Sequence, residues 1–373
     1  MLTLSEQICR HAEPGLFMTS FATGCVREVH LTATALPGET AAELCARTGR
    51  ALENADATAA SITAFDLAAP ANVLAWQSPL QESFGDACPL TMVETLAPQP
   101  MRRPALEVLA IVAAPLQPIY AGGRAIGNVW QSETLRHCVL GDLRGKNASD
   151  AAGDQTQHVF DLMLRALAEA DMGFEHVFRT WYRNAEIVRW YAEFNRVRTA
   201  FFKAQHVFEN LVPASTGIGA TNPHGVALIA GLRAAATLDG QRCAVDVPSP
   251  LQQPAGNYGS SFSRAAECDL GSHRLLTISG TASINPAGET VFLNDTRRQV
   301  GETLRVIEAI LRSRSMAWCN TTRALAYFRH PDDMRLLAPA LRSLGVPLLP
   351  VVNSTQTVCR DNLLFELELD AVA

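Results

Sequence analysis

The sequence contains very little lysine. Of its 31 basic residues only Lys146 and Lys203 are lysines, and the rest are arginines. No run of basic residues is longer than two, and the formal net charge is −6. Because binding to nucleic-acid phosphates needs concentrated positive charge, this pattern argues against a nucleic-acid partner.

The sequence also lacks a long apolar run. No stretch reaches the roughly eighteen residues that a membrane helix needs. Residues 1–15 carry acidic and polar side chains where a signal peptide would have a basic end followed by an apolar run. We therefore expect a cytoplasmic protein without a membrane partner.

Paired cysteines and the short motifs of several enzyme classes are missing. The nine cysteines are odd in number, dispersed and free of CxxC pairs, which indicates buried apolar residues or a single functional thiol. The nine histidines never form HxH, HxxxH or HExxH, so a metal site has no local support. GxGxxG after a strand, GxxxxGK[ST] and GxSxG are also absent, which argues against nucleotide-binding and α/β-hydrolase functions.

The chain has ample apolar side chains for a packed core. Hydrophobic residues make up 48% and charged residues 18% of its 373 residues, which excludes an intrinsically disordered protein. The length corresponds to two or three domains.

An internal duplication organises the chain. Residues 154–179 align with residues 298–323 without a gap at an offset of 144, which places Gln155 on Gln299 and Arg179 on Arg323. Apolar residues recur at intervals of three and four, which predicts an amphipathic helix followed by a turn and a strand. A gapless register over this length indicates a repeated unit.

The flanks extend the two copies. Strands are expected at 116–123 and 275–282, helices at 189–203 and 332–343, and further strands at 213–219 and 353–359. Each unit therefore alternates strands with helices that cover one sheet face. The expected division is a divergent α/β region (1–110), a first unit (111–239), a Pro- and Gly-rich linker (240–262) and a second unit (263–373).

Several motifs occur in an order that resembles a known family. SGTASI (279–284), the following helix with Gln299 and the late motif CRDNLLFELE (359–368) are similar to the YjgF/RidA fold. Over about residues 110–370 the chain more specifically resembles the chorismatases, which are tandem YjgF-like proteins that cleave chorismate. The other motifs that carry this resemblance are RTWYRN (179–184), YAEFNRVRTAFF (191–202), PASTGIGA (213–220) and YFRHPDD (327–333).

The resemblance implies both a fold and an activity. The fold would be α/β (α+β), made of tandem YjgF/RidA-like, chorismate-mutase-like units, each a mixed sheet with helices on one face. The activity would be the cleavage of chorismate, a small-molecule substrate, with release of pyruvate and without a cofactor. Because tandem units can imitate the trimer that single YjgF units form, we expect a monomer or weak homo-oligomer.

Glu366 is the candidate catalytic acid. Strand alternation puts Glu366 and Glu368 on one face and an apolar series on the other, which we expect beneath the helices. Alternation alone favours two solvated glutamates. The resemblance matches Glu366 to the family's catalytic glutamate, which burial would keep protonated near neutral pH, and leaves Glu368 structural. The apolar series is Leu363, Phe365, Leu367 and Leu369.

Cys359 and Gly280 bear on the product. Taken alone, Cys359 is most simply a buried apolar residue. The resemblance matches Cys359 and Gly280 to the branch of the family that forms 3-hydroxybenzoate, and it implies that both residues shape the reaction.

The substrate's two carboxylates need cationic or dipolar partners. Arginine suits bidentate binding of a carboxylate, and the resemblance selects Arg179, Arg198 and Arg329. The turn at Thr216 and Gly217 can offer backbone N–H groups to an anion. The complete set of expected substrate-binding residues is Arg179, Tyr182, Arg198, Thr216, Gly217, Gly280 and Arg329.

Three alternatives remain open at this point. The first is a hydrolytic chorismatase, which forms a dihydroxycyclohexadiene carboxylate, or an enzyme that gives a mixture of 3- and 4-hydroxybenzoate. The second is an imine deaminase of the YjgF/RidA type, against which residues 213–216 argue because that family has an arginine in this turn. The third is a ligand-binding protein without enzymatic activity.

Overall fold

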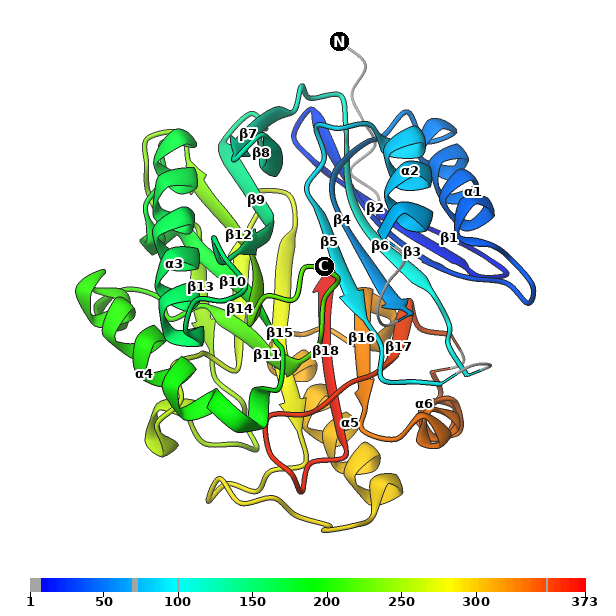
Figure 1. Ribbon diagram of the computed structural model, residues 1–373, viewed down its shortest axis with the longest axis vertical. Coiled ribbons are helices and arrows are strands. Elements are labelled where there is room, and N and C mark those ends of the chain that lie inside the picture. Colours follow the sequence, from blue (N-terminus) through cyan, green and yellow to red (C-terminus); the bar gives the residue numbers. More distant parts are fainter. Residues whose placement is uncertain (1–7, 69–72, 99–100, 347) are drawn as a thin grey trace.

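The computed structural model describes residues 8–68, 73–98, 101–346 and 348–373. Within this part of the chain the strands form three six-stranded mixed sheets, each accompanied by two α-helices (Figure 1). The protein therefore has an α+β fold, as the sequence predicts.

The first sheet lies in the N-terminal third of the chain, and its strand order is β1-β2-β3-β6-β4-β5. Its elements are β1 (Cys9–Glu13), β2 (Leu16–Thr23), β3 (Val26–Thr34), α1 (Ala41–Glu53), β4 (Thr58–Leu67), α2 (Val73–Phe84), β5 (Leu90–Glu94) and β6 (Ala105–Val112).

The second sheet follows, and its order is β7-β8-β9-β12-β10-β11. Its elements are β7 (Gln117–Ala121), β8 (Arg124–Gln131), β9 (Leu135–Arg144), α3 (Ala152–Glu169), β10 (Val177–Asn184), α4 (Ile187–Ala204), β11 (Ala214–Gly219) and β12 (Leu228–Thr237), with short 3-10 helices η1 (Phe174–His176) and η2 (Val207–Glu209).

The third sheet completes the chain, and its order is β13-β14-β15-β18-β16-β17. Its elements are β13 (Ala244–Val247), η3 (Ala255–Tyr258), β14 (Ala265–Asp269), β15 (Arg274–Ala282), α5 (Thr296–Ser313), η4 (Trp318–Asn320), β16 (Thr321–Phe328), η5 (Pro331–Leu336), α6 (Leu337–Ser343), β17 (Val351–Thr355) and β18 (Phe365–Val372).

The duplication seen in the sequence is present in the structure. Helices α3 and α5, the 3-10 helices η1 and η4, and strands β10 and β16 begin and end at positions that differ by 144. In each copy a helix connects two parallel strands, β10 with β11 and β16 with β17, because a parallel pair needs a crossover connection.

One detail of the expected organisation is wrong. The expected strand at 116–123 is β7, an edge strand, whereas the strand at 275–282 is β15, which takes the place that β9 takes in the second sheet. The expected linker contains β13, which pairs with β14 at the edge of the third sheet. The strand order also repeats in residues 9–112, where the sequence alone indicated no copy. The expected division into units stays a prediction.

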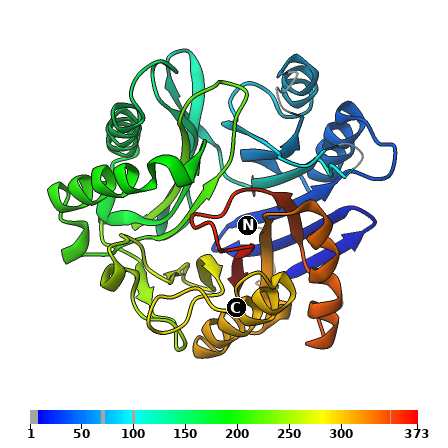
Figure 2. The same cartoon turned by 60° about the horizontal axis from the view of Figure 1, so that its bottom comes forward.

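The three sheets face one another, and the helices lie outside them (Figure 2). The edge strand of each sheet reaches the next sheet: β11 contacts β15, β17 contacts β3, and β5 contacts β9. Phe365, Leu367 and Leu369 of β18 pack beneath α5, as expected, in a core with Val300, Leu304 and Ile307. The acidic face of β18 therefore points toward the junction of the sheets. The expectation is wrong for Leu363, which lies before the start of β18 in a different cluster with Ile218 and Tyr327.

No helix in the described ranges is long and apolar enough to cross a membrane.

Candidate active site

Glu366 lies on the inward face of β18 at the boundary between the second and third sheets. It pairs with Ala282 on β15 and with Tyr327 on β16, and only 4% of it is exposed. Burial, reinforced by the nearby charge of Glu368 and opposed by Arg179, raises the pKa of Glu366 to about 8. A solvated position is therefore excluded, and the carboxyl group holds a proton at neutral pH.

Gly280 lies directly against this carboxyl group. The pairing of β15 with β18 is irregular between Ile278 and Thr281, so Gly280 sits at a bulge. A Cβ atom at this position would lie 2.1 Å from Glu366 Oε1 and 3.1 Å from Thr216 Cγ2. The absence of a side chain here makes the space that the Glu366 carboxyl group occupies.

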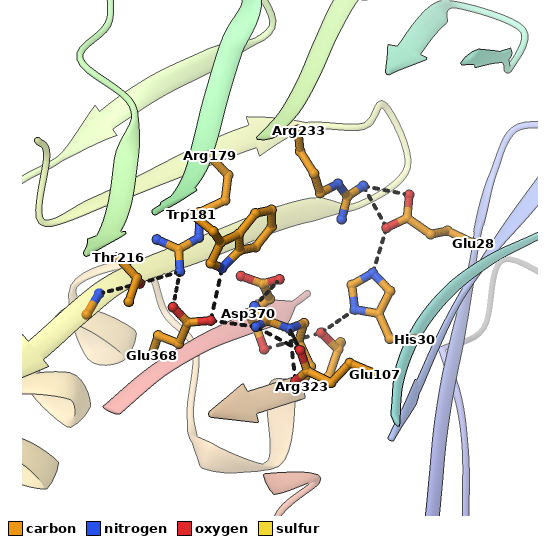
Figure 3. A network of polar contacts seen from close by, with 12 residues as sticks. Glu28, His30, Glu107, Arg179, Trp181, Thr216, Arg233, Arg323, Glu368 and Asp370 are labelled. Carbon is orange, nitrogen blue, oxygen red and sulfur yellow. Dashed lines mark hydrogen bonds and ion pairs between the residues drawn. The ribbon is translucent and has the colours of Figure 1, made fainter. Parts of the chain in front are cut away.

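Glu368 is the centre of a buried hydrogen-bond network that joins the second and third sheets (Figure 3). Its carboxylate accepts from Arg179 Nη2 at 2.6 Å, Trp181 Nε1 at 2.9 Å and Arg323 Nη2 at 2.6 Å. Burial opposes ionisation, but Arg179 and Arg323 outweigh it and lower the pKa of Glu368. The two glutamates of β18 thus lie in opposite protonation states, Glu366 neutral and Glu368 charged, at neutral pH.

Arg179 has hydrogen-bond donors to spare. It is fully buried, and its Nη2 donates to Glu368 and, at 2.7 Å, to Thr216 Oγ1. Its Nε and Nη1 are buried without a hydrogen-bond partner. Because an unsatisfied buried donor is costly, these two N–H groups are suited to bind an anion.

Thr216 connects β11 to β15. Besides the bond from Arg179, its Oγ1 accepts from the backbone N–H of Gly280 at 3.0 Å. Ser279 Oγ accepts in the same way from the backbone N–H of Ser215 at 2.8 Å. These bonds fix Gly280 and Arg179 relative to each other, although they come from different sheets.

Cys359 lies close enough to Glu366 for the charge of the glutamate to act on the thiol. The segment before it crosses to β11, where Thr357 and Gly219 exchange backbone hydrogen bonds at 2.7 and 3.0 Å. Burial, and next the charge of Glu366, raise the pKa of the Cys359 thiol to about 12, while a hydrogen bond to Tyr191 acts in the opposite direction. The thiol is therefore protonated and is not a nucleophile at neutral pH.

Tyr182 on β10 and Arg198 on α4 lie between this strand and this helix, on the opposite face of β10 from Trp181. Tyr182 packs against Phe160 and Phe194 in the core of the second sheet. Arg198 is 2% exposed, stacks over Tyr182 and Phe194, and donates to Asn195 Oδ1 at 2.6 Å. Its Nε has no partner. The structure thus brings Tyr182 and Arg198 to each other, and neither contacts Glu368 or Thr216 among the described interactions.

The remaining two expected binding residues have clear surroundings. Arg329 donates to the backbone oxygens of Arg360 and Leu363 and pairs with Asp361 at 3.1 Å, so it holds the loop before β18 instead of facing Glu366. At Gly217 the nearest atom to an added Cβ would be Tyr191 Cε2, at 3.9 Å. Gly217 therefore leaves room beside Tyr191.

Four side chains of this region were not singled out from the sequence: Trp181, Tyr191, Arg323 and Glu107. Arg323 pairs with Glu368, with Asp370 at 3.1 Å and with Glu107 at 3.1 Å, so it joins the first sheet to the third. The equivalence of Arg323 with Arg179 in the duplication was the available signal. Glu107 gave none, because it lies in the region where the sequence showed no copy.

No glutamate occupies the position equivalent to Glu366 in the first or second sheet. The equivalent strand pairs of the three sheets are β16 with β18, β10 with β12, and β4 with β6. Tyr327 pairs with Glu366 in the third sheet, and at the equivalent positions Arg183 pairs with Ile229 and Phe65 pairs with Ala105. The position of Glu366 is thus held by Ile229 in the second sheet and by Ala105 in the first. Among the described residues, no three His, Cys, Asp or Glu side chains gather closely enough to hold a metal ion.

Comparisons with known proteins agree with the resemblance seen in the motifs. No protein-family model matches the chain. A 3-hydroxybenzoate synthase from Streptomyces hygroscopicus is 25% identical over 245 residues, which is 58% of this chain and 68% of that protein. A crystal structure of a chorismatase superposes with a TM-score of 0.63 at 19% identity, covering 92% of this chain and 98% of that one. The sequence likeness and the shared fold together support a chorismatase-family protein.

Proposed function

We propose that this protein cleaves chorismate into pyruvate and 3-hydroxybenzoate, with Glu366 as the general acid. The observation that carries the proposal is the buried Glu366 carboxyl group, whose pKa is about 8 and which lies against Gly280. The names of the two similar proteins, a chorismatase and a 3-hydroxybenzoate synthase, support the same substrate and product.

In the proposed first step, neutral Glu366 protonates the terminal methylene carbon of the enolpyruvyl ether. This gives an oxocarbenium ion, which makes the ether oxygen a good leaving group. A carboxylic acid serves here only if it is protonated at neutral pH, and burial provides that condition for Glu366. The fixed negative charge of Glu368 both keeps Glu366 neutral and stabilises a nearby cation.

In the proposed second step, the ring hydroxyl of the substrate attacks the carbon that carries the ether. The ring carbon–oxygen bond breaks, pyruvate leaves, and the Glu366 carboxylate takes the hydroxyl proton. The resulting arene-oxide-like species rearranges to 3-hydroxybenzoate. Chorismate contains all the atoms of both products, so no water is consumed.

We assign the binding of one substrate carboxylate to Arg179. Its Nε and Nη1 are the unpartnered buried donors nearest to the two glutamates, and an arginine fork binds a carboxylate with two parallel hydrogen bonds. We assign to Cys359 and Gly280 the shaping of the pocket around Glu366. Cys359 is a protonated thiol and Gly280 has no side chain, so both leave apolar surface where a water molecule would otherwise find a partner.

The test compares Glu366→Gln with the parent protein, measuring pyruvate release from chorismate. Glutamine preserves the shape of the side chain but has no acidic proton, so we expect a loss of at least about 100-fold, in line with the usual contribution of general acid catalysis. Glu186→Gln is the matched control, because Glu186 is exposed and pairs only with Arg189 among the described ion pairs. Circular dichroism spectra verify that both variants fold.

Parent-like turnover in Glu366→Gln would refute the assigned mechanism. Absence of turnover in the parent itself would refute the proposed activity and leave a ligand-binding protein.

A further inference from the structure

The junction between the first and second sheets is built like the one that holds Glu366. Strand β9 occupies in the second sheet the place that β15 occupies in the third sheet. β9 pairs with β12 and β15 pairs with β18, and each pairing contains a bulge. When the residue pairs of these two strand pairings are aligned, Asp142 occupies the position of Gly280, and Arg144 occupies the position of Ala282. The backbone N–H of Asp142 donates to Thr91 Oγ1 at 2.9 Å, as that of Gly280 donates to Thr216 at 3.0 Å.

A carboxyl group is present at this junction too, but another strand provides it. Ile229 stands where Glu366 would be, whereas Asp142 stands at the glycine position. A side chain built at Gly280 would enter the space of the Glu366 carboxyl group, at 2.1 Å. The Asp142 side chain therefore enters the corresponding space at the second junction.

Asp142 is held in an unusual state for a buried carboxylate. Its backbone φ is +49°, which costs free energy for a residue with a side chain, and the residue is 5% exposed. Its Oδ2 lies 3.0 Å from Arg124 Nε and 3.5 Å from Arg144 Nη2. Its Oδ1 is buried and has no hydrogen-bond partner. A structure keeps such an unsatisfied acceptor at a cost, which a ligand with a hydrogen-bond donor would remove.

A cavity of about 400 Å³ opens beside Asp142. This volume falls within the range of small-molecule binding sites, which combine apolar walls with a few polar groups. The polar groups beside Asp142 are Arg124, Arg144 and His224, and Gln77, Gln81, Asp86 and Tyr120 complete the polar lining. The apolar wall comes from the first sheet and α2, with Ile62, Leu80, Phe84, Leu90 and Met92.

Taken together with the cavity that adjoins it, this cavity has an excess of positive charge, since four basic side chains (Arg124, Arg144, Lys146 and Arg165) face two carboxylates, Asp142 and Asp86. Arg124 and Arg144 share the single carboxylate of Asp142, and burial, Arg144 and Arg124 keep the pKa of His224 near 4, so that His224 is neutral. An adjoining cavity of about 750 Å³ shares both arginines and adds Lys146 and Arg165. Asp86 is exposed and accepts from Gln81, and the described ion pairs of Arg124 and Arg144 are with Asp142, so a ligand carboxylate can pair with the two arginines.

We infer that this cavity is a second ligand site, which binds a small organic carboxylate that also carries a hydrogen-bond donor. The carboxylate pairs with Arg144 and Arg124, the donor reaches Asp142 Oδ1, and the apolar body lies against Leu80 and Phe84. This site is separate from the Glu366 site, and it does not depend on the proposed reaction.

The test measures binding by isothermal titration calorimetry with 3-hydroxybenzoate, which has both groups, and with benzoate, which lacks the donor. The proteins are the parent, Arg144→Met and the control Arg189→Met, whose guanidinium is exposed and pairs with Glu186. We expect a binding step that is at least tenfold weaker in Arg144→Met, unchanged in the control, and severalfold weaker for benzoate. A crystal soaked with 3-hydroxybenzoate should contain the ligand beside Asp142.

A second variant guards against misfolding of Arg144→Met. Gln77 is an exposed residue of α2 that lines the same cavity, so Gln77→Trp fills the space from the opposite wall. It should weaken the same binding step without altering the unfolding transition. The inference is overturned if both variants bind 3-hydroxybenzoate like the parent, or if the soaked ligand is found at Glu366 alone or nowhere. Chorismate turnover, measured on the same variants, reports on the first site and should not change.

Discussion

Two glutamates on the same strand face, Glu366 and Glu368, differ in charge because their neighbours differ. Arginines surround Glu368, whereas Glu366 faces Gly280 and the negative charge of Glu368. Pairs of carboxyl groups whose pKa values are pushed apart mark acid–base sites. The proposed reaction depends on the protonated state of Glu366.

The pH dependence of turnover follows from the sign of this shift. Glu366 donates a proton only below its pKa, so kcat/KM should fall as the pH rises through about 8. If the group had an ordinary carboxyl pKa of 4.5, the fall would occur in the acid range instead. A pH–rate profile of chorismate consumption between about pH 3 and pH 10 distinguishes these cases.

The same shift affects stability. A carboxyl group whose pKa is raised on folding disfavours the folded state once it ionises, so its cost is absent below about 4.5 and complete above about 8. Glu366→Gln should therefore gain stability relative to the parent as the pH rises from 5 to 9. Denaturant unfolding at a series of pH values measures this, and an unchanged difference would contradict the buried, raised pKa.

Gly280→Ala tests the contact between the strands at the acid. The added methyl group would lie 2.1 Å from Glu366 Oε1, so the carboxyl group must turn aside, which a flexible side chain can do without unfolding the protein. We expect a folded variant that loses about tenfold to 100-fold in kcat, since misplacing a catalytic group by about 1 Å costs on this order. Product chromatography should also find a larger share of the dihydroxycyclohexadiene carboxylate. A variant with the turnover and products of the parent would remove Gly280 from the account.

At the scale of elements, the site depends on the junction of β11 and β15. The Thr216 hydroxyl group connects Arg179 on β10 with the backbone of Gly280, so one side chain sets the distance between the anion-binding donors and the acid. Thr216→Val keeps the shape but removes both hydrogen bonds. We expect a loss of about 1–3 kcal/mol in stability, because buried donors are left unsatisfied.

The Thr216→Val variant should also raise KM for chorismate, since Arg179 loses one of the two bonds that fix its guanidinium. Thr290→Val is the matched control, since the Thr290 hydroxyl group bonds Asn362 at an exposed site. Parent-like KM and stability in Thr216→Val would mean that the junction does not position Arg179.

The elements themselves were largely predictable, because periodic apolar residues report which face of a helix or strand is buried. The offset of 144 located α3, β10, α5 and β16 correctly. The match of β7 with β15 was wrong because both stretches combine strand-forming residues with glycine, at 122–123 and at 280, whereas sheet position is decided by pairing partners far along the chain. The order of β1 to β6 was missed because Ser61 stands where Arg179 and Arg323 mark the other copies.

The site was less predictable than the elements. Glu366, Gly280, Thr216 and Arg179 converge as the motifs suggested, but Arg329 binds a loop and Tyr182 lies in a core. The sequence around a single arginine does not indicate which residue will accept its hydrogen bonds in the folded protein. The network around Arg323 includes Glu107, which lies 216 residues earlier, and such a contact exists only in the folded chain.

At the scale of the whole molecule, buried ion pairs connect the three sheets at their common centre (Figure 3). Glu28 on β3 pairs with Arg233 on β12 at 2.8 Å and with His30, and His30 bonds Thr322 on β16 at 2.7 Å. These contacts and the pair of Arg323 and Glu107 join the first sheet to the other two, and the pair of Arg179 and Glu368 joins the second sheet to the third. The relative placement of the sheets, and hence of Glu366 and Arg179, depends on this centre.

Acid sensitivity should follow from Glu28. Burial would raise its pKa, but Arg233 and His30 outweigh burial and lower it to about 2. Its contribution to stability is therefore complete above its ordinary value of 4.5 and is lost as the pH falls toward 2. Glu28→Gln should lose about 3–5 kcal/mol at neutral pH, because Arg233 is left buried without its partner.

The difference in unfolding free energy between the parent and Glu28→Gln should shrink as the pH falls from 5 to 3. Urea unfolding followed by circular dichroism measures it. A difference that does not depend on pH would mean that Glu28 is not charged in the folded protein.

We propose that this protein releases pyruvate from chorismate through Glu366 without consuming water. An isotope-labelling experiment tests this proposal. Purified protein is incubated with chorismate in water enriched in oxygen-18, and the products are identified by chromatography and mass spectrometry. The account predicts pyruvate and 3-hydroxybenzoate, with no label in the hydroxybenzoate. A dihydroxycyclohexadiene carboxylate, labelled or unlabelled, would contradict the internal route, and unconsumed chorismate would contradict the activity itself.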